Sequence, residues 1–333
     1  MRVLILKPRL DLPFKKFSAS ISDTNLPEIR THWEKFVNTL AQSHRNKNDD
    51  VVIVEAPRWQ FTNDVVKHYN ADRVYVPHTE EDRFQGGETC MYYMQSVFPG
   101  LFTIDSKGWG GGATFADIKH DTGLDGKDLP ISSGLLSEVY DEYKKRIENG
   151  QTKFAQPDNG KDFVLDQEFI FVPLQLPHDE TIKYHSDVDV PNLVTSLCHW
   201  SARTQVPVVF KGHPINRGSM EPLKKIIEQY VIDSPIAYVD DIDIHKMLRA
   251  SSAVYVINSG VGMEAMLHNK PVVSFGRSEY QEFVIQGDIC DLDAAWREAQ
   301  QSLSYIREYD YKVFFDWYVK KIAYNCNKIE DFS

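Results

Sequence analysis

Residues 253–275 read AVYVINSGVGMEAMLHNKPVVSF and carry the clearest structural pattern in the chain. An apolar run ends in a glycine-bearing turn, a helical pattern follows, and a second apolar run begins at residue 271. Two strands joined through a helix in this way lie parallel in one sheet. Similar runs alternate with helical patterns elsewhere, so the sequence predicts an α/β fold. The expected strands span residues 3–6, 51–55, 74–76, 101–104, 169–174, 206–211, 236–239, 253–257 and 271–275.

The chain is long enough for two domains, because its 333 residues exceed the usual size of one hydrophobic core. The polar segment 149–162 (NGQTKFAQPDNGKD) separates two α/β series and is the expected linker. We therefore expect two Rossmann-like α/β domains facing a cleft, over residues 1–160 and 161–300. Residues 301–333 are expected to form an aromatic-rich helical tail.

The composition excludes several classes of protein. Hydrophobic residues make up 42 % and charged residues 26 % of the chain, as in a folded globular protein. With 37 basic and 48 acidic residues the formal net charge is −11, which disfavours nucleic-acid binding. No apolar run approaches the ~18 residues of a membrane span. The four cysteines lie far apart without a C-x-x-C pair, so we expect buried, reduced thiols in a cytoplasmic protein.

Polar residues at the carboxyl ends of strands are the candidate site residues, because ligands of open α/β sheets bind there. The expected strand at 169–174 runs into Gln175 and then Asp179. The Asp179 carboxylate has the chemistry of a nucleophile or a general base. The alternative is that it caps the next helical turn.

Two further strand ends carry charged residues. Lys211, His213 and Pro214 follow the strand at 206–211, and their cations suit an anionic group. Asp240 and Asp241 follow the next strand, where carboxylates of nucleotide sites commonly bind ribose hydroxyls. D-x-D triplets arise often by chance in an acidic chain, so no metal site is expected.

The turn after residue 257 has the pattern of an anion site, since backbone N–H groups at a glycine-bearing helix start face outward. Its G-x-G-x-x-A string also matches a dinucleotide fingerprint. That alternative is disfavoured because the string follows a late strand of its domain. The candidate binding residues of this turn are Asn258, Ser259, Gly260, Gly262 and Glu264.

The first half of the chain offers two carboxylates for acid–base work. Asp105 ends the strand at 101–104 and precedes the glycine-rich stretch SKGWGGG at 106–112, which permits close approach of a substrate. Glu88 closes a second polar loop, RFQGGE at 83–88. The alternative for the glycine-rich stretch is a flexible surface turn.

The ordered motifs PLQ at 173–175, KGHP at 211–214, NSGVGMEA at 258–265 and KPVVSFG at 270–276 resemble the capsule polysaccharide synthesis family of bacterial glycosyltransferases. That family includes the retaining β-Kdo transferases. The resemblance is firmest over residues 169–280. The His-Pro motif with a later serine is also similar, more distantly, to the GT-B sialyltransferases.

The resemblance implies a GT-B fold, with the acceptor on the first domain, the nucleotide on the second, and a last helix that crosses back. It implies transfer of an acidic sugar, first of all Kdo from CMP-β-Kdo, to a cell-surface glycan or glycolipid. No cofactor or metal is expected, because protein cations neutralise the leaving phosphate.

The resemblance also implies roles for single residues. Asp179 matches the position of the carboxylate nucleophile of retaining β-Kdo transferases. His213 and Ser259 would hold the donor phosphate. Asp240 or Asp241 would lie near the ribose. Asp105 or Glu88 would deprotonate the acceptor hydroxyl. Attack by Asp179 and then by the acceptor are two displacements at the anomeric carbon, which together would retain its configuration. From its charge alone, Lys211 is expected to meet the sugar carboxylate.

Several alternatives stay open at this point. One alternative is a GT-B transferase or an epimerase that uses a UDP- or GDP-sugar. Another, from a different class of protein, is a non-catalytic assembly subunit that binds a sugar nucleotide. A dehydrogenase is the remote alternative. The aromatic tail either packs between the domains or supports peripheral membrane association.

Overall fold

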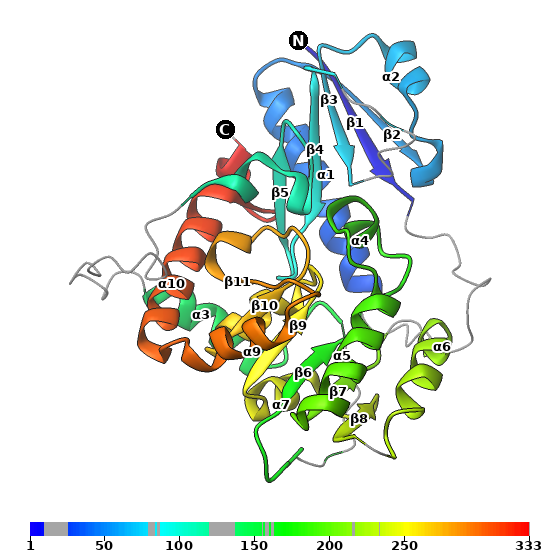
Figure 1. Cartoon of the computed structure of the whole chain (residues 1–333). Coiled ribbons are helices and arrows are strands. Elements are labelled where there is room, and N and C mark those ends of the chain that lie inside the picture. Colours follow the sequence, from blue (N-terminus) through cyan, green and yellow to red (C-terminus); the bar gives the residue numbers. More distant parts are fainter. Residues whose placement is uncertain are drawn as a thin grey trace.

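A computed structural model of the chain describes residues 1–9, 26–78, 84, 87–119, 137–154, 156, 160, 163–214, 217–232 and 234–332. It contains two six-stranded sheets, each covered by helices (Figure 1). The expected α/β class with two parallel-sheet units is therefore confirmed. We call the part built on the first sheet the first half and the part built on the second sheet the second half.

The second sheet is parallel throughout, in the order β11-β10-β9-β6-β7-β8. The chain starts at β6, builds outward through β7 and β8, and then continues on the other side of β6 with β9. The strand order thus reverses between β6 and β9, and such a reversal opens a crevice at the carboxyl ends of the two strands. The strands are β6 (Ile170–Pro173), β7 (Val208–Lys211), β8 (Ile236–Val239), β9 (Ala253–Val256), β10 (Val272–Ser274) and β11 (Ile285–Gln286).

Helices connect these strands and follow from the local sequence. The helix α5 (Val190–Thr204) begins at Asp189, whose side chain accepts a hydrogen bond from Asn192 N, and it carries Pro at its first turn. Its apolar face is buried against the sheet. The others are α4 (Glu180–His185), α6 (Arg217–Glu228), α7 (Ile244–Ala250), α8 (Val261–Leu267) and α9 (Leu292–Gln301).

The first sheet has the order β12-β5-β4-β3-β1-β2. Sequence reasoning missed β4, whose stretch CMYYMQ lacks a β-branched run. A five-residue connection, 96–100, follows it, and so short a link joins only antiparallel neighbours, which reverses β5. The strands are β1 (Arg2–Pro8), β2 (Asp50–Ala56), β3 (Arg73–Pro77), β4 (Cys90–Gln95), β5 (Leu101–Asp105) and β12 (Ala323–Asn325).

Three helices come from the first 150 residues: α1 (Leu26–Asn46), α2 (Asn63–Tyr69) and α3 (Ser137–Glu148). The expected apolar face of α1, which includes Trp33 and Phe36, is buried on the first sheet. By contrast, α3 packs with the second half, where the Tyr140 hydroxyl donates to Met266 O over 2.9 Å. The helix before the expected boundary at residue 160 therefore belongs by packing to the second half.

The C-terminal segment returns to the first half. After α10 (Ser304–Trp317) and a π-helical turn, Tyr318–Ile322, the chain adds β12 antiparallel to β5. Its last turn lies on α1, where Ser43 Oγ donates to Phe332 O over 2.7 Å. Most tail aromatics are buried, which favours packing within the protein over a membrane surface as their role. In the parts of the chain that the structure describes, no helix is long and apolar enough to cross a membrane.

The cysteines are unpaired, as expected, and all four lie in the described residues. Cys90, Cys198 and Cys326 are buried. Cys290 is exposed, so the expectation of four buried thiols is wrong at that position.

A stability test follows from the core of the first half. Phe36 is fully buried, and its ring stacks on Phe102 with centroids 4.1 Å apart. We expect Phe36→Ala to lower the free energy of unfolding by about 3–5 kcal/mol, because it removes apolar burial and leaves a cavity. Urea unfolding of the variant and of the exposed control Lys35→Ala measures the effect. An equal loss in both variants would contradict this packing.

Candidate functional site

At the strand reversal of the second sheet, Gln175 and Asn258 pair across the carboxyl ends of β6 and β9. Gln175 Nε2 donates to Asn258 Oδ1 over 3.0 Å, and the Asn258 backbone N–H donates to Gln175 Oε1 over 3.1 Å. Asn258 Nδ2 reaches on to Thr181 O at 2.8 Å. Three elements, the ends of β6 and β9 and the start of α4, are thus fixed to one another at the edge where ligands bind.

Asp179 lies at this edge and caps α4. Its Oδ1 accepts hydrogen bonds from Thr181 N at 3.0 Å and from Thr181 Oγ1 at 2.9 Å. The capping role considered from sequence is therefore confirmed. It does not remove Asp179 from the site, because both bonds use Oδ1 and the side chain is only partly buried.

The end of β7 contributes Lys211 and His213. Lys211 is buried, and a side chain on Gly212 would overlap the hydroxyl of Tyr238 and approach Asp240. Burial lowers the pKa of His213 to about 4, with Asp179 opposing the shift and Lys211 reinforcing it. His213 is thus neutral at pH 7, whereas the sequence interpretation gave it a positive charge.

The remaining candidate residues near Lys211 and His213 differ in how far they are buried. Asp240 is partly buried beside Gly212, and Pro214 is partly buried after His213. Asp241 is exposed. Of the two candidate ribose carboxylates, Asp240 is therefore the one that lies against the site.

Sequence reasoning missed two site residues, because both lie in the expected linker. The ring of Phe154 meets the ring of His213 edge-on, with centroids 5.8 Å apart. Burial lowers the pKa of Lys153, and Asp179, Glu279 and Glu264 oppose that shift. The linker thus brings a cation to carboxylates from three separate elements. Linker residues 155, 157–159, 161 and 162 lie outside the described residues.

The turn after β9 has the expected strand–turn–helix form. Ser259 Oγ accepts a hydrogen bond from Val261 N at 3.2 Å, and the Tyr280 hydroxyl donates to Ser259 O. Gly262 has no room for a side chain, because the ring of Tyr280 covers it. Gly260 packs against Val97 of the first half, so the turn lies where the two halves meet. We call this region the junction.

Glu264, on the first turn of α8, is buried in the second half. Burial raises its pKa to about 8, while Lys153 lowers it and Asp243 raises it further. A carboxyl group with this pKa is mostly protonated at pH 7, so Glu264 can donate a hydrogen bond.

Asp105 organises its own loop. Its two oxygens accept hydrogen bonds from Lys107 N at 2.8 Å, Gly108 N at 3.1 Å and Thr114 N at 3.0 Å, and also from Thr114 Oγ1. Both oxygens are therefore engaged by groups of the same loop, which gives Asp105 a structural role rather than the expected acid–base one.

The glycine-rich loop that Asp105 holds is a contact between the halves. Trp109 is buried edge-on against His185 of α4, with ring centroids 4.6 Å apart. Arg277 Nε donates to Gly111 O over 3.1 Å, and Arg277 Nη2 donates to Asp117 Oδ1 over 2.8 Å. The glycines permit this close packing, so the alternative of a flexible surface turn is wrong.

Glu88 lies away from the junction. It is exposed and precedes β4, which runs parallel to β3 with Val74 opposite Cys90. Glu88 therefore lies at the amino end of this strand pair, whereas His78 lies at the carboxyl end, where Arg58 reaches Glu180 of α4 over 2.5 Å. The sequence showed the polar loop but not the strand direction. Residues 83, 85 and 86 of that loop lie outside the described residues.

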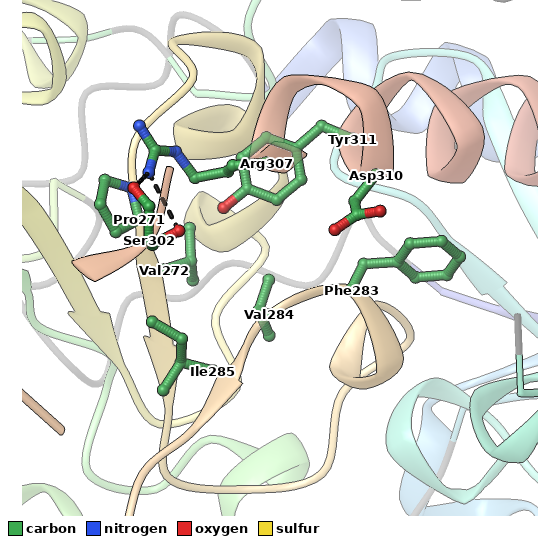
Figure 2. A pocket seen from close by; sticks show the side chains of 9 residues that line it. All are labelled: Pro271, Val272, Phe283, Val284, Ile285, Ser302, Arg307, Asp310 and Tyr311. Atoms are coloured by element: carbon green, nitrogen blue, oxygen red, sulfur yellow. Dashed lines mark hydrogen bonds between the residues drawn. The ribbon is translucent and has the colours of Figure 1, made fainter. Parts of the chain in front are cut away.

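A separate small pocket lies between β10 and α10 (Figure 2). Arg307 occupies it and donates to Ser302 O over 2.6 Å and to Ser302 Oγ over 3.0 Å. Its space of about 10 Å³ matches a single water molecule and excludes a nucleotide. The junction, not this pocket, is the candidate site.

Two α/β units that present polar strand ends to a shared junction define a protein of the GT-B architecture. The chain aligns over 94 % of its length with 90 % of a solved structure of KpsC from Thermosulfurimonas dismutans, a beta Kdo 2,7 transferase, at a TM-score of 0.51 and 14 % identity. This likeness confirms the fold.

The family described as "Capsule polysaccharide biosynthesis protein" matches residues 137–308, and the chain belongs to this family. It is 33 % identical over 123 residues to the capsule polysaccharide export protein KpsS of Escherichia coli, which covers 35 % of this chain and 32 % of KpsS. It is 28 % identical over 123 residues to the capsule polysaccharide modification protein LipB of Neisseria meningitidis, which covers 34 % of this chain and 29 % of LipB. The chain thus spans about a third of the length of the curated relatives that it matches.

The buried Glu264 generates a prediction about pH. Its folded pKa of about 8 lies above its ordinary value of 4.5. Between these values the folded chain holds a proton that the unfolded chain has lost, so Glu264 lowers stability increasingly as pH rises from about 4.5 to 8. We expect Glu264→Gln to gain thermal stability over the wild type across this window. Calorimetric melting temperatures from pH 4 to pH 9 measure it. The exposed control Glu298→Gln should show a pH-independent difference, and the same result for Glu264→Gln would contradict the prediction.

Proposed function

We propose that the chain is a glycosyltransferase of capsule polysaccharide biosynthesis that transfers an acidic sugar, Kdo from CMP-β-Kdo, to a cell-surface glycan or glycolipid. The observation that carries this proposal is the gathering of Asp179, His213 and Lys153 at the carboxyl edge of the second sheet, where Asp179 caps α4 and Phe154, next to Lys153, packs on His213. Family membership and the GT-B fold support it. We choose Kdo as the donor sugar of this proposal because the structural neighbour named above is a beta Kdo 2,7 transferase.

The donor nucleotide would lie along the carboxyl edge of the second sheet. Lys211 and His213 approach it from β7 and the Ser259 turn from β9, so the phosphate can meet cations and backbone N–H groups together. Asp240, beside Gly212, is the nearer candidate for the ribose. In this proposal these protein groups neutralise the leaving phosphate, and no metal or other cofactor takes part.

Asp179 would act as the nucleophile. One of its oxygens attacks the anomeric carbon, the bond to the CMP phosphate breaks, and the electron pair leaves with CMP. A phosphate bound at His213 would raise the low pKa of the imidazole and favour its protonated form. The leaving group thus generates the charge that stabilises it.

The acceptor would approach from the first half, whose loops close the junction opposite Asp179. A reaction on a cell-surface glycan or glycolipid would take place in the cytoplasm, at the inner face of the membrane. The sugar acceptor and that location are parts of the proposal.

A nucleotide panel tests the donor. We expect CMP to bind without Mg²⁺ and in preference to CDP, UMP, UDP, GDP and NAD. At 100 times its dissociation constant it should stabilise the chain by ~2.7 kcal/mol, visible in a thermal shift and measurable by calorimetry. His213→Ala should weaken CMP binding by about tenfold or more, because a charge-assisted hydrogen bond is lost. Preference for UDP or GDP would contradict the proposal that the donor is a CMP-sugar, and binding of NAD alone would indicate a dehydrogenase.

Asparagine at position 179 separates the two roles of that residue. Asn caps helices as well as Asp does, but it is not a nucleophile here. We expect Asp179→Asn to keep the melting temperature and CMP affinity and to lose at least ~10³-fold in transfer. The exposed Asp187→Asn is the matched control, and release of CMP from CMP-β-Kdo is the assay. Near-normal turnover of Asp179→Asn would rule out the double displacement. A wild type that binds CMP but transfers no sugar would favour a non-catalytic binding subunit.

A further inference from the structure

Glu279 lies in the loop after β10 and is held at the junction from several sides. Its neighbour Tyr280 binds Ser259 O, which ties this loop to the candidate phosphate turn. The hydroxyl of Tyr318, from the returning C-terminal segment, lies 3.3 Å from Glu279 Oε2 and 3.1 Å from Ser96 Oγ of the first half. Both halves and the tail therefore fix the position of one carboxyl group.

Tyr318 binds Oε2 of this carboxyl group, so the other oxygen, Oε1, is the one that could accept a proton in a reaction. Glu279 Oε1 is closed off from solvent, and among the residues that the structure describes no hydrogen bond of ordinary length and angle reaches it, although the Thr103 side chain lies near the carboxyl group. The Lys153 ammonium interacts with Glu279 and, more strongly, with Asp179, so both carboxylates act on the same cation. Lys153 thus links Glu279 electrostatically to the proposed nucleophile.

We propose that Glu279 is the general base that removes the proton of the acceptor hydroxyl. This inference rests on the proposed function and supplies the second carboxylate that neither Asp105 nor Glu88 provides. The acceptor oxygen attacks the anomeric carbon of the sugar carried on Asp179. The bond from that carbon to Asp179 breaks and its electron pair returns to the carboxylate, while the hydroxyl proton passes to Glu279 Oε1. Water that enters when the product leaves then takes up this proton.

The electrostatic setting suits this role. Burial raises the pKa of Glu279 to about 7, and the Tyr318 hydroxyl, Lys153 and the Thr103 hydroxyl oppose the shift. A general base works best with a pKa near the working pH. The titratable groups that face Glu279 are Lys153 from the linker, Tyr318 from the tail and Tyr280 beside it in its own loop. Because the ionised form is the base, its step should accelerate as pH rises through about 7.

The test uses the full chain, CMP-β-Kdo and water as the acceptor. We expect the wild type to release CMP and free Kdo continuously. Glu279→Gln should give a burst of about one CMP for each chain, accumulate the mass of one Kdo residue on Asp179, and lose at least ~100-fold in the release of free Kdo. Glu282→Gln, a carboxylate of the same loop, is the matched control and should behave as the wild type.

Tyr318→Phe distinguishes a base from a merely structural carboxyl group. It removes a hydrogen bond that favours the ionised form of Glu279, so the acidic limb of the pH–rate profile should move to higher pH. The inference is overturned if Glu279→Gln releases Kdo as fast as Glu282→Gln, or if Tyr318→Phe leaves the limb in place. If the wild type and Glu282→Gln release no CMP from the donor, the proposed function itself fails and this inference falls with it.

Discussion

The pairing of Gln175 with Asn258 is the constraint on which the rest of the site depends. Two parallel strands on either side of a reversal diverge at their carboxyl ends, and nothing in the sheet itself holds the loops beyond them. The two buried amides close that gap with complementary donors and acceptors. Because Asn258 also binds the first turn of α4, the position of Asp179 is set by the same contacts as the Ser259 turn.

Charge is distributed unevenly between the molecule and its junction. The chain carries a formal net charge of −11, yet Lys153, Lys211 and His213 gather where an anion would bind. Burial there shifts the pKa of basic and acidic groups in opposite directions: it lowers the pKa of His213 and raises that of Glu264. It keeps His213 neutral and Glu264 protonated at pH 7. The junction thus avoids several uncompensated buried charges, which are costly in a protein interior.

Much of the fold could be predicted from the sequence, because the strand–turn–helix pattern at 253–275 and the short apolar runs report local structure directly. The site was predictable where its residues follow strands, as Asp179, His213 and Ser259 do. Other parts were not. Lys153 and Phe154 lie in a polar stretch that looks like a linker, and only packing brings them to His213. Asp105 was chosen because it ends a strand and Glu88 because it closes a polar loop, and the sequence does not reveal the direction of the neighbouring strands.

The route of the chain has a mechanical consequence. The polypeptide leaves the first sheet after β5 and comes back to it through Tyr318–Ile322, so two covalent connections join the halves. Two anchored points define an axis, and turning about that axis stretches neither connection, whereas sliding the halves apart stretches both. Rotation of one half against the other is therefore the motion that these two connections permit. In the structure the contacts of Arg58 with Glu180 and of Arg277 with Gly111 O bridge the halves and hold them at their observed angle.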